Sequence, residues 1–143
     1  MNIERLKKQI KQHEGIRNQA YPDTLGNWTT GVGHLIKLPD EEYLINTRLK
    51  DIEVEQIFIT DLNQAIDDAR KFIDADDVPE EVFEVVVNMS FNLGINKLLQ
   101  FKKFQQALKE KDFIKASEEM LDSRWAKQLP NRSKELANIV RNA

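Results

Sequence analysis

The sequence has no cysteine and only two histidines among its 143 residues. The lack of cysteine excludes thiol nucleophiles, thiolate zinc sites and disulfide frameworks, and two histidines leave a zinc hydrolase poorly supported. Long hydrophobic runs are also missing, since none approaches the roughly 20 apolar residues that a membrane-spanning helix needs. The first 15 residues lack the apolar core of a signal peptide. We therefore expect a protein that starts in the cytoplasm without stable membrane association.

Neither sign of charge dominates the chain. It carries 21 Lys and Arg against 24 Asp and Glu, a net charge of −3, and is therefore not expected to bind nucleic acid. The charges are nevertheless segregated. Residues 1–39 hold 6 basic and 3 acidic side chains, residues 40–84 hold 4 and 15, and residues 85–143 hold 11 and 6. The middle of the chain is acidic, and both ends are basic.

The first third of the chain predicts a helix followed by a small β-hairpin sheet. Apolar residues spaced three and four apart favour an amphipathic helix over the first dozen residues, which Gly15 ends. Residues 20–34 combine turn formers with strand formers such as Tyr21 and Trp28, as is typical of a hairpin. A short helix is expected after Pro39.

The rest of the chain predicts helices. A stripe of apolar residues indicates a helix of more than 20 residues from Asp51, long enough to bridge two lobes. Asp77 has the position of an N-cap, with Pro79 in the first turn of a helix that runs to Gly94. That helix is apolar on nearly every side and should be the central core helix, although the β-branched run Val85–Val87 could also form a strand. Shorter helices are expected at about residues 98–109, 112–121 and 131–141, the last one capped by Asn131.

Two acidic residues near the N-terminus are candidates for catalysis. Glu14 lies in the last turn of the first helix, where the aligned peptide dipoles disfavour an ionised carboxylate. It is either a solvated surface side chain or a carboxyl that keeps its proton and serves as a general acid. Asp23 belongs either to an ordinary Pro-Asp turn or to a catalytic pair with Glu14. A helix-end Glu that faces a hairpin Asp, with Thr29 and Thr30 on the returning strand, is a layout that glycoside hydrolysis uses.

These residues belong to a longer motif. The chain reads EGIRNQAYPDTLGNWTTGVGH from Glu14 to His34. This segment resembles the signature of the bacteriophage-type lysozymes, glycoside hydrolase family 24, with its conserved types in the same order and spacing. Two further segments resemble other blocks of that family, NMSFNLG at Asn88–Gly94 and SRWAKQLPNR at Ser123–Arg132. The resemblance covers nearly the whole chain.

The resemblance implies a mainly α fold of the α+β lysozyme-like class, in a single domain over residues 1–143. A small N-terminal lobe, about residues 14–50, would hold the β-hairpin sheet, and a connecting helix would span about residues 51–73. A helical C-terminal lobe, about residues 74–143, would follow, with the helix of residues 1–13 packed on it.

For the active site, the resemblance implies that Glu14 is the general acid, that Asp23 helps to activate or orient a water molecule, and that Thr29 holds this water. The family inverts the anomeric configuration, so the two carboxyls should lie roughly 6.5–9.5 Å apart. The matching position of Arg132 approaches the catalytic Glu. The arginine would favour the ionised acid, whereas burial and the helix end favour the protonated form. The sequence leaves this balance open.

Further residues of the motifs have two interpretations each. The resemblance pairs His34 with Asp61 behind the hairpin, which favours a structural role over a catalytic one. Asn92 either hydrogen-bonds the saccharide or serves as a polar residue at a helix end. Arg124 and Trp125 are divided between substrate contact and packing within the helical lobe.

The activity that the resemblance implies is hydrolysis of the β-1,4 bond between N-acetylmuramic acid and N-acetylglucosamine in peptidoglycan glycan strands, with no metal or organic cofactor. It further implies an endolysin, by default a monomer, that waits in the cytoplasm until a holin permeabilises the inner membrane. The alternatives are a lytic transglycosylase, which would not need Asp23 and Thr29, a catalytically silent peptidoglycan-binding module, and a secreted or injected effector.

Overall fold

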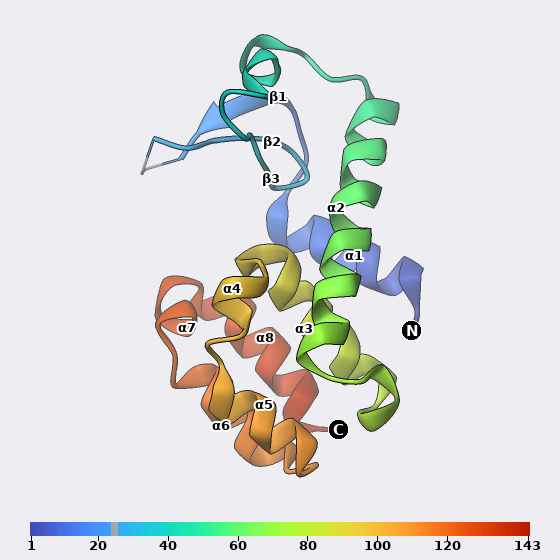
Figure 1. The fold of residues 1–143 in the computed structure, drawn as a ribbon, viewed down its shortest axis with the longest axis vertical. Coiled ribbons are helices and arrows are strands. Elements are labelled where there is room, and N and C mark those ends of the chain that lie inside the picture. The colour runs from blue at the N-terminus through green and yellow to red at the C-terminus, as the bar shows by residue number, and fades with distance from the viewer. Residues whose placement is uncertain (24–25) are drawn as a thin grey trace. The chain divides into compact units, whose positions relative to one another are not determined.

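The structure is a computed structural model that describes residues 1–23 and 26–143. The chain is mainly α-helical with a small antiparallel sheet near the N-terminus, as predicted (Figure 1). Thr24 and Leu25 of the predicted hairpin lie outside the described residues. The elements, in chain order, are α1 (Ile3–Glu14), β1 (Arg17–Pro22), β2 (Trp28–Gly31), β3 (His34–Leu35), the 3-10 helix η1 (Glu42–Asn46), α2 (Asp51–Phe72), the 3-10 helix η2 (Ala75–Asp77), α3 (Glu80–Leu93), α4 (Ile95–Leu98), α5 (Lys102–Lys109), α6 (Phe113–Leu121), α7 (Arg124–Gln128) and α8 (Pro130–Arg141).

The described residues group into two units. The smaller unit is Lys7–Asn63 and contains the sheet, and the larger one combines Met1–Leu6 with Gln64–Ala143 and contains α3 to α8. Helices α1 and α2 contribute residues to both. The single domain and the lobe boundaries expected from the sequence stay a prediction. None of the described helices is long and apolar enough to cross a membrane.

The smaller unit is built on the antiparallel sheet β1–β2–β3. Thr29 of β2 pairs with Tyr21 of β1, but the register shifts between Tyr21 and Arg17, where β1 bulges. Within the bulge, Asn18 pairs with Leu49 instead: its backbone oxygen accepts from the Leu49 amide at 2.7 Å, and its side-chain amide donates to the Leu49 oxygen at 2.9 Å. A bulge re-aims a strand, and this one ties β1 to the segment before α2.

Helix α3 is the buried centre of the larger unit. Every residue from Val82 to Ser90 is buried, because neighbouring elements cover the helix on all sides over this stretch. The predicted core helix is confirmed, and the strand considered for Val85–Val87 is excluded.

The polar side chains on this buried stretch are hydrogen-bonded to other elements. They bind Arg5 of α1 (Nε to Glu84 Oε1, 2.8 Å), Arg132 of α8 (Nη2 to Asn88 Oδ1, 2.7 Å) and Ala65 of α2 (Ser90 Oγ to the Ala65 oxygen, 3.0 Å). A buried polar group without a partner costs about 1–3 kcal/mol. These bonds therefore allow polar residues in the core and specify which helices surround α3.

The N-cap predicted at Asp77 is wrong. Asp74 caps the short turn η2, because its side chain accepts from the Asp76 amide at 2.9 Å, and the Asp77 amide donates to the Asp74 oxygen in the same turn. Pro79 takes the cap position of α3, and its carbonyl accepts from the Phe83 amide at 3.1 Å. Asp77 is thus used by the acidic turn that precedes the helix.

The cap predicted at Asn131 is also wrong. Leu129 caps α8, and Pro130 follows as its first residue, where the fixed φ and the missing N–H of proline fit a helix start. Asn131 therefore falls inside the first turn. The helix predicted over residues 98–109 is divided, since α4 ends at its start and α5 begins only at Lys102. The short helix α7 was not predicted.

The Thr30 hydroxyl is a buried polar group without compensation. Thr30 lies in β2 and is fully buried, and in the described part of the chain its Oγ1 atom has no hydrogen-bond partner. The desolvation of such a group is not repaid by a new bond, which costs about 1–3 kcal/mol. The hydroxyl is therefore a local source of instability in the smaller unit.

Thr30→Val should raise the free energy of unfolding by about 1 kcal/mol, because it removes the desolvated hydroxyl and keeps both shape and strand preference. Urea denaturation followed by circular dichroism measures the change. Thr60→Val is a matched control in the same unit, since Thr60 is exposed on α2 and donates to the Gln56 oxygen. It should stay within about 0.5 kcal/mol of the wild type. A destabilised Thr30→Val would contradict the assignment.

His34 is clamped between two carboxylates in the smaller unit. Its Nδ1 atom lies 2.7 Å from Asp61 Oδ2, the predicted partner, and its Nε2 atom lies 3.0 Å from Glu41 Oε1, which the sequence did not predict. Both ring nitrogens can donate only when the imidazole is protonated. The hydrogen bond to Asp61 raises the pKa of His34 most strongly, against the opposing effect of burial. Burial opposes the lowering of the pKa of Glu41, but the Lys37 amide and His34 outweigh it.

The hydrogen bonds of His34 to Asp61 and Glu41 should make the free energy of unfolding depend on pH, and the titration of His34 determines whether it falls or rises with pH. Its pKa is raised above 6.5, so its contribution is complete below about pH 6.5 and is lost as the pH rises through the raised pKa. Thermal unfolding of the wild type and of His34→Asn from about pH 5 to 9 tests this. The difference in Tm should be largest on the acidic side and should shrink on the alkaline side. Glu41→Gln should move that loss to lower pH. A difference that grows with pH would contradict the sign.

Candidate active site

Glu14 is the last residue of α1, and its side chain is half-buried. The helix ends here because Gly15 has φ +77°, a left-handed conformation that glycine adopts readily. The Glu14 carboxyl lies against the turn between β2 and β3. A Cβ atom at Gly33 of this turn would come within 2.8 Å of the Glu14 Cδ and Oε2 atoms. The end of α1 thus places the carboxyl of the predicted acid against the β2–β3 turn of the smaller unit.

Asp23 follows β1 and is exposed. Its Oδ1 atom accepts from the Asn27 amide at 2.9 Å, and its own amide donates to the Asn27 oxygen at 2.7 Å. The turn role considered from the sequence is therefore present. The same bonds hold the carboxylate at a defined place before β2 begins, and the catalytic role of Asp23 stays a prediction.

Thr29 is half-buried on β2, opposite Tyr21. Tyr21 precedes Asp23 by two residues, so the pairing of β1 with β2 brings Thr29 near the end of the strand from which Asp23 follows. The Tyr21 ring is held in turn by the Arg17 guanidinium, 4.5 Å above its centroid. Glu14, Asp23 and Thr29 all belong to the smaller unit.

The predicted substrate-binding residue Asn92 lies in the larger unit, near the end of α3. Its Oδ1 atom accepts from Trp125 Nε1 at 2.9 Å. Trp125 is 4% exposed and packs edge-to-face against Phe101, with ring centroids 6.1 Å apart. The packing role considered for Trp125 is confirmed, and Asn92 fixes the orientation of its indole. Binding of a saccharide by Asn92 stays a prediction.

Arg132 lies in the first turn of α8 and is buried. It donates from Nε and Nη2 to Asn88 Oδ1, at 3.1 and 2.7 Å, and so ties α8 to α3. Glu14 belongs to the smaller unit and Arg132 to the larger one. The approach of the two that the resemblance implies stays a prediction.

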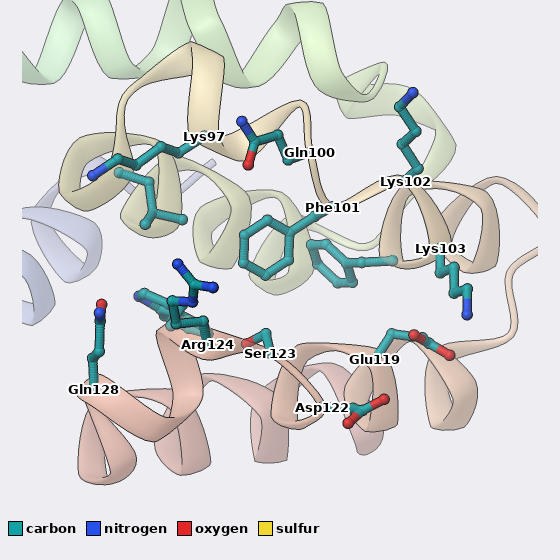
Figure 2. Close-up of a pocket in the computed structure, with 13 residues that line it drawn as sticks. Lys97, Gln100, Phe101, Lys102, Lys103, Glu119, Asp122, Ser123, Arg124 and Gln128 are labelled. Carbon is teal, nitrogen blue, oxygen red and sulfur yellow. The ribbon is translucent and has the colours of Figure 1, made fainter.

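Arg124 is exposed and lines a cavity of about 660 Å³ within the larger unit. Figure 2 shows Arg124 of α7 on one side of the cavity and Lys97, Lys102 and Lys103 along the α4–α5 segment, with the Phe101 ring between them. The sequence did not predict Phe101 or Lys97 as site residues. An aromatic residue directly before two lysines, at Phe101–Lys103, was the available signal in the sequence.

The cavity also has a carboxylate side. Glu119 of α6 and Asp122, which follows that helix, line it opposite the lysines (Figure 2). Cationic side chains still outnumber these two carboxylates, and the buried rings of Trp125 and Phe104 add apolar lining. The lining therefore suits a ligand that carries both anionic and apolar groups.

Comparison with known proteins identifies the family of the chain. The phage lysozyme family matches residues 11–142. The chain belongs to the phage lysozyme family. The protein is therefore an enzyme, a glycoside hydrolase.

Similar proteins occur in a slime mould and in a phage. The chain is 28% and 26% identical to two proteins of Dictyostelium discoideum named "Probable T4-type lysozyme 1" and "Probable T4-type lysozyme 2", with 96% of this chain and 94% of each relative covered. It is 25% identical to "Peptidoglycan hydrolase gp36" of Pseudomonas phage phiKMV, where the match covers 89% of this chain and 14% of that protein.

Lys102 and Lys103 are exposed beside the cavity and should attract an anionic cell-wall substrate at long range. Replacing both by glutamine should slow the clearing of outer-membrane-stripped Gram-negative cells about threefold at low salt. The effect should shrink towards 0.1 M salt, where charges are screened beyond about 10 Å.

The double variant Lys109→Gln/Lys111→Gln is the matched control. It removes the same charge from exposed positions of the same unit that do not line the cavity. Its clearing rate should stay close to that of the wild type. A slowing that is independent of salt, or equally large in the control, would contradict steering by Lys102 and Lys103.

Proposed function

We propose that this enzyme is a muramidase that hydrolyses the β-1,4 bond between N-acetylmuramic acid and N-acetylglucosamine in bacterial peptidoglycan. Family membership and relatives named as lysozymes and as a peptidoglycan hydrolase support this substrate. The observation that carries the proposal is the arrangement of the smaller unit. There the carboxyl of Glu14 lies against the β2–β3 turn, and Thr29 pairs with the strand that leads to Asp23.

The proposed mechanism inverts the anomeric configuration with two carboxyls. Glu14 donates its proton to the glycosidic oxygen as the bond from that oxygen to the anomeric carbon of N-acetylmuramic acid breaks. A water molecule, held by the Thr29 hydroxyl, attacks the anomeric carbon from the opposite face and passes a proton to Asp23. Glu14 then regains a proton from solvent, and Asp23 releases one.

Local hydrogen bonds support the role of Asp23. The Asn27 amide holds one carboxylate oxygen at 2.9 Å, so the side chain has few orientations to lose when substrate and water bind. Catalytic groups that are held in place before binding contribute more to the rate than mobile ones. The exposed turn that looked like an argument against catalysis is thus compatible with a positioned base.

The larger unit contributes substrate binding in this proposal. Arg124 binds the glycan strand from the edge of the cavity, where it is exposed next to cationic side chains. Asn92 acts through the indole of Trp125, which it orients. Arg132 is assigned to substrate binding with Asn88 as the acceptor that holds its guanidinium in place.

The biological role that fits this activity is lysis of a bacterial host at the end of phage growth. The enzyme would be made as a monomer in the host cytoplasm and would reach the cell wall after a holin permeabilises the inner membrane. A phage-type family and a glycan-cleaving activity support this role.

Glu14→Gln should lower the rate at which the enzyme clears outer-membrane-stripped Gram-negative cells by about 10²–10⁴-fold, because glutamine cannot donate the proton. Circular dichroism should show an unchanged fold. Glu4→Gln is the matched control, since Glu4 is exposed in the first turn of the same helix. It should clear cells at the wild-type rate. Undiminished clearing by Glu14→Gln would refute the muramidase mechanism.

The products separate hydrolysis from transglycosylation. Hydrolysis adds one water to each cleaved bond, whereas a lytic transglycosylase closes an anhydro ring and adds none. Mass spectrometry of digested glycan strands should therefore find reducing ends one water heavier than the anhydro form. Freshly released ends should have the α configuration, as inversion of a β bond requires. Binding without any cleavage would indicate a peptidoglycan-binding module.

A further inference from the structure

Gly31, the last residue of β2, and Gly33, in the turn that follows, have the same backbone conformation and different surroundings. Gly31 and Gly33 both have φ +62°. A Cβ atom at Gly31 would lie 3.8 Å from Val54 Cγ1, an ordinary contact. A Cβ atom at Gly33 would lie 2.8 Å from the Glu14 Cδ and Oε2 atoms and 3.1 Å from its Cβ atom. The Glu14 carboxyl thus occupies the space that any side chain at position 33 would need.

We propose that Gly33 is a positioning residue for the general acid: its bare backbone is the surface against which the Glu14 carboxyl is seated for proton donation. The inference rests on the proposed function, because that function makes Glu14 the acid. Gly33 itself needs no contact with the substrate. It acts by allowing the carboxyl to come closer to the sheet than any other residue type at position 33 would permit.

The contact with Gly33 matters for the position of the carboxyl, because Glu14 has a long side chain at a helix end. Free rotation about its staggered torsions would move the carboxyl between several separate places. A displacement of about 1 Å from the productive geometry can cost about 100-fold in rate. Contact with the turn removes the orientations in which the carboxyl would overlap the Gly33 backbone, and so restricts where the proton is offered.

The turn is a firm support for this contact. His34 follows Gly33 directly and is held by Asp61 at 2.7 Å and by Glu41 at 3.0 Å. His34 also pairs with Thr30 across the turn. A side chain added at Gly33 therefore meets an anchored backbone, and the Glu14 side chain is the partner that must shift.

Gly33→Ala and Gly31→Ala form a matched pair that separates seating from backbone strain. Both substitutions place alanine at φ +62°, so the backbone strain should lower the Tm of both variants by a similar amount. Only Gly33→Ala also displaces Glu14. On soluble peptidoglycan strands, at a temperature where both variants are folded, Gly33→Ala should lower kcat about 100-fold with little change in KM. Gly31→Ala should stay within about threefold of the wild-type kcat.

A double-mutant cycle in thermal stability tests the overlap without needing activity. Glu14→Ala removes the atoms that the new Cβ would meet at 2.8 Å. The loss of Tm caused by Gly33→Ala should therefore be clearly smaller in the Glu14→Ala background than in the wild type, whereas the loss caused by Gly31→Ala should be the same in both. If Gly33→Ala folds only when Glu14 is truncated, the overlap is supported.

Three outcomes would overturn the inference. The first is an equal kcat for Gly33→Ala and Gly31→Ala. The second is a loss of Tm from Gly33→Ala that does not depend on residue 14. The third is failure of Gly33→Ala to fold in both backgrounds while Gly31→Ala folds, since Gly33 would then serve the fold alone. Failure of the proposed function is recognised separately, by undiminished clearing in Glu14→Gln.

Discussion

The structure of the larger unit depends on the burial of α3 from Val82 to Ser90. A helical stretch that is buried on all sides needs apolar neighbours all round, and each polar side chain on it needs a hydrogen-bond partner. Glu84, Asn88 and Ser90 meet this demand through α1, α8 and α2. The same residues that permit burial thus specify the neighbours. Through Asn88 and Asn92, the helix also orients Arg132 and Trp125, two residues of the family motifs.

The smaller unit solves a different problem, the close approach of a carboxyl to a sheet. Gly33 in the β2–β3 turn leaves the room for the carboxyl, and the hydrogen bonds of His34 to Asp61 and Glu41 fix the backbone beside it. The buried Thr30 hydroxyl shows that this region is not optimised for stability alone. Under the proposed function such a local cost is tolerated, because geometry at the reacting bond governs the rate.

Sequence reasoning succeeded where local chemistry decides the outcome. The spacing of apolar residues predicted α1, the 22-residue α2 and α3, since the apolar face of a helix is formed by residues that are close together in the sequence. It failed at Asp77 and Asn131, where several residues could serve as the cap and the backbone of the preceding turn chose another. It also missed Glu41 as a partner of His34, because the spacing of the two residues along the chain does not indicate a hydrogen bond between them.

The sequence by itself determined the fold class and the family, because these follow from periodicity and from motifs that are contiguous in the chain. The resemblance of those motifs also supplied the predicted acid, base and water-holding residue. Only the tertiary structure decided which groups touch: Glu14 against Gly33, Asn92 on Trp125, and the cations that gather around the cavity of the larger unit. Contacts of this kind depend on φ values, strand register and helix placement. Those quantities are set by packing over the whole unit, and no local stretch of residues contains them.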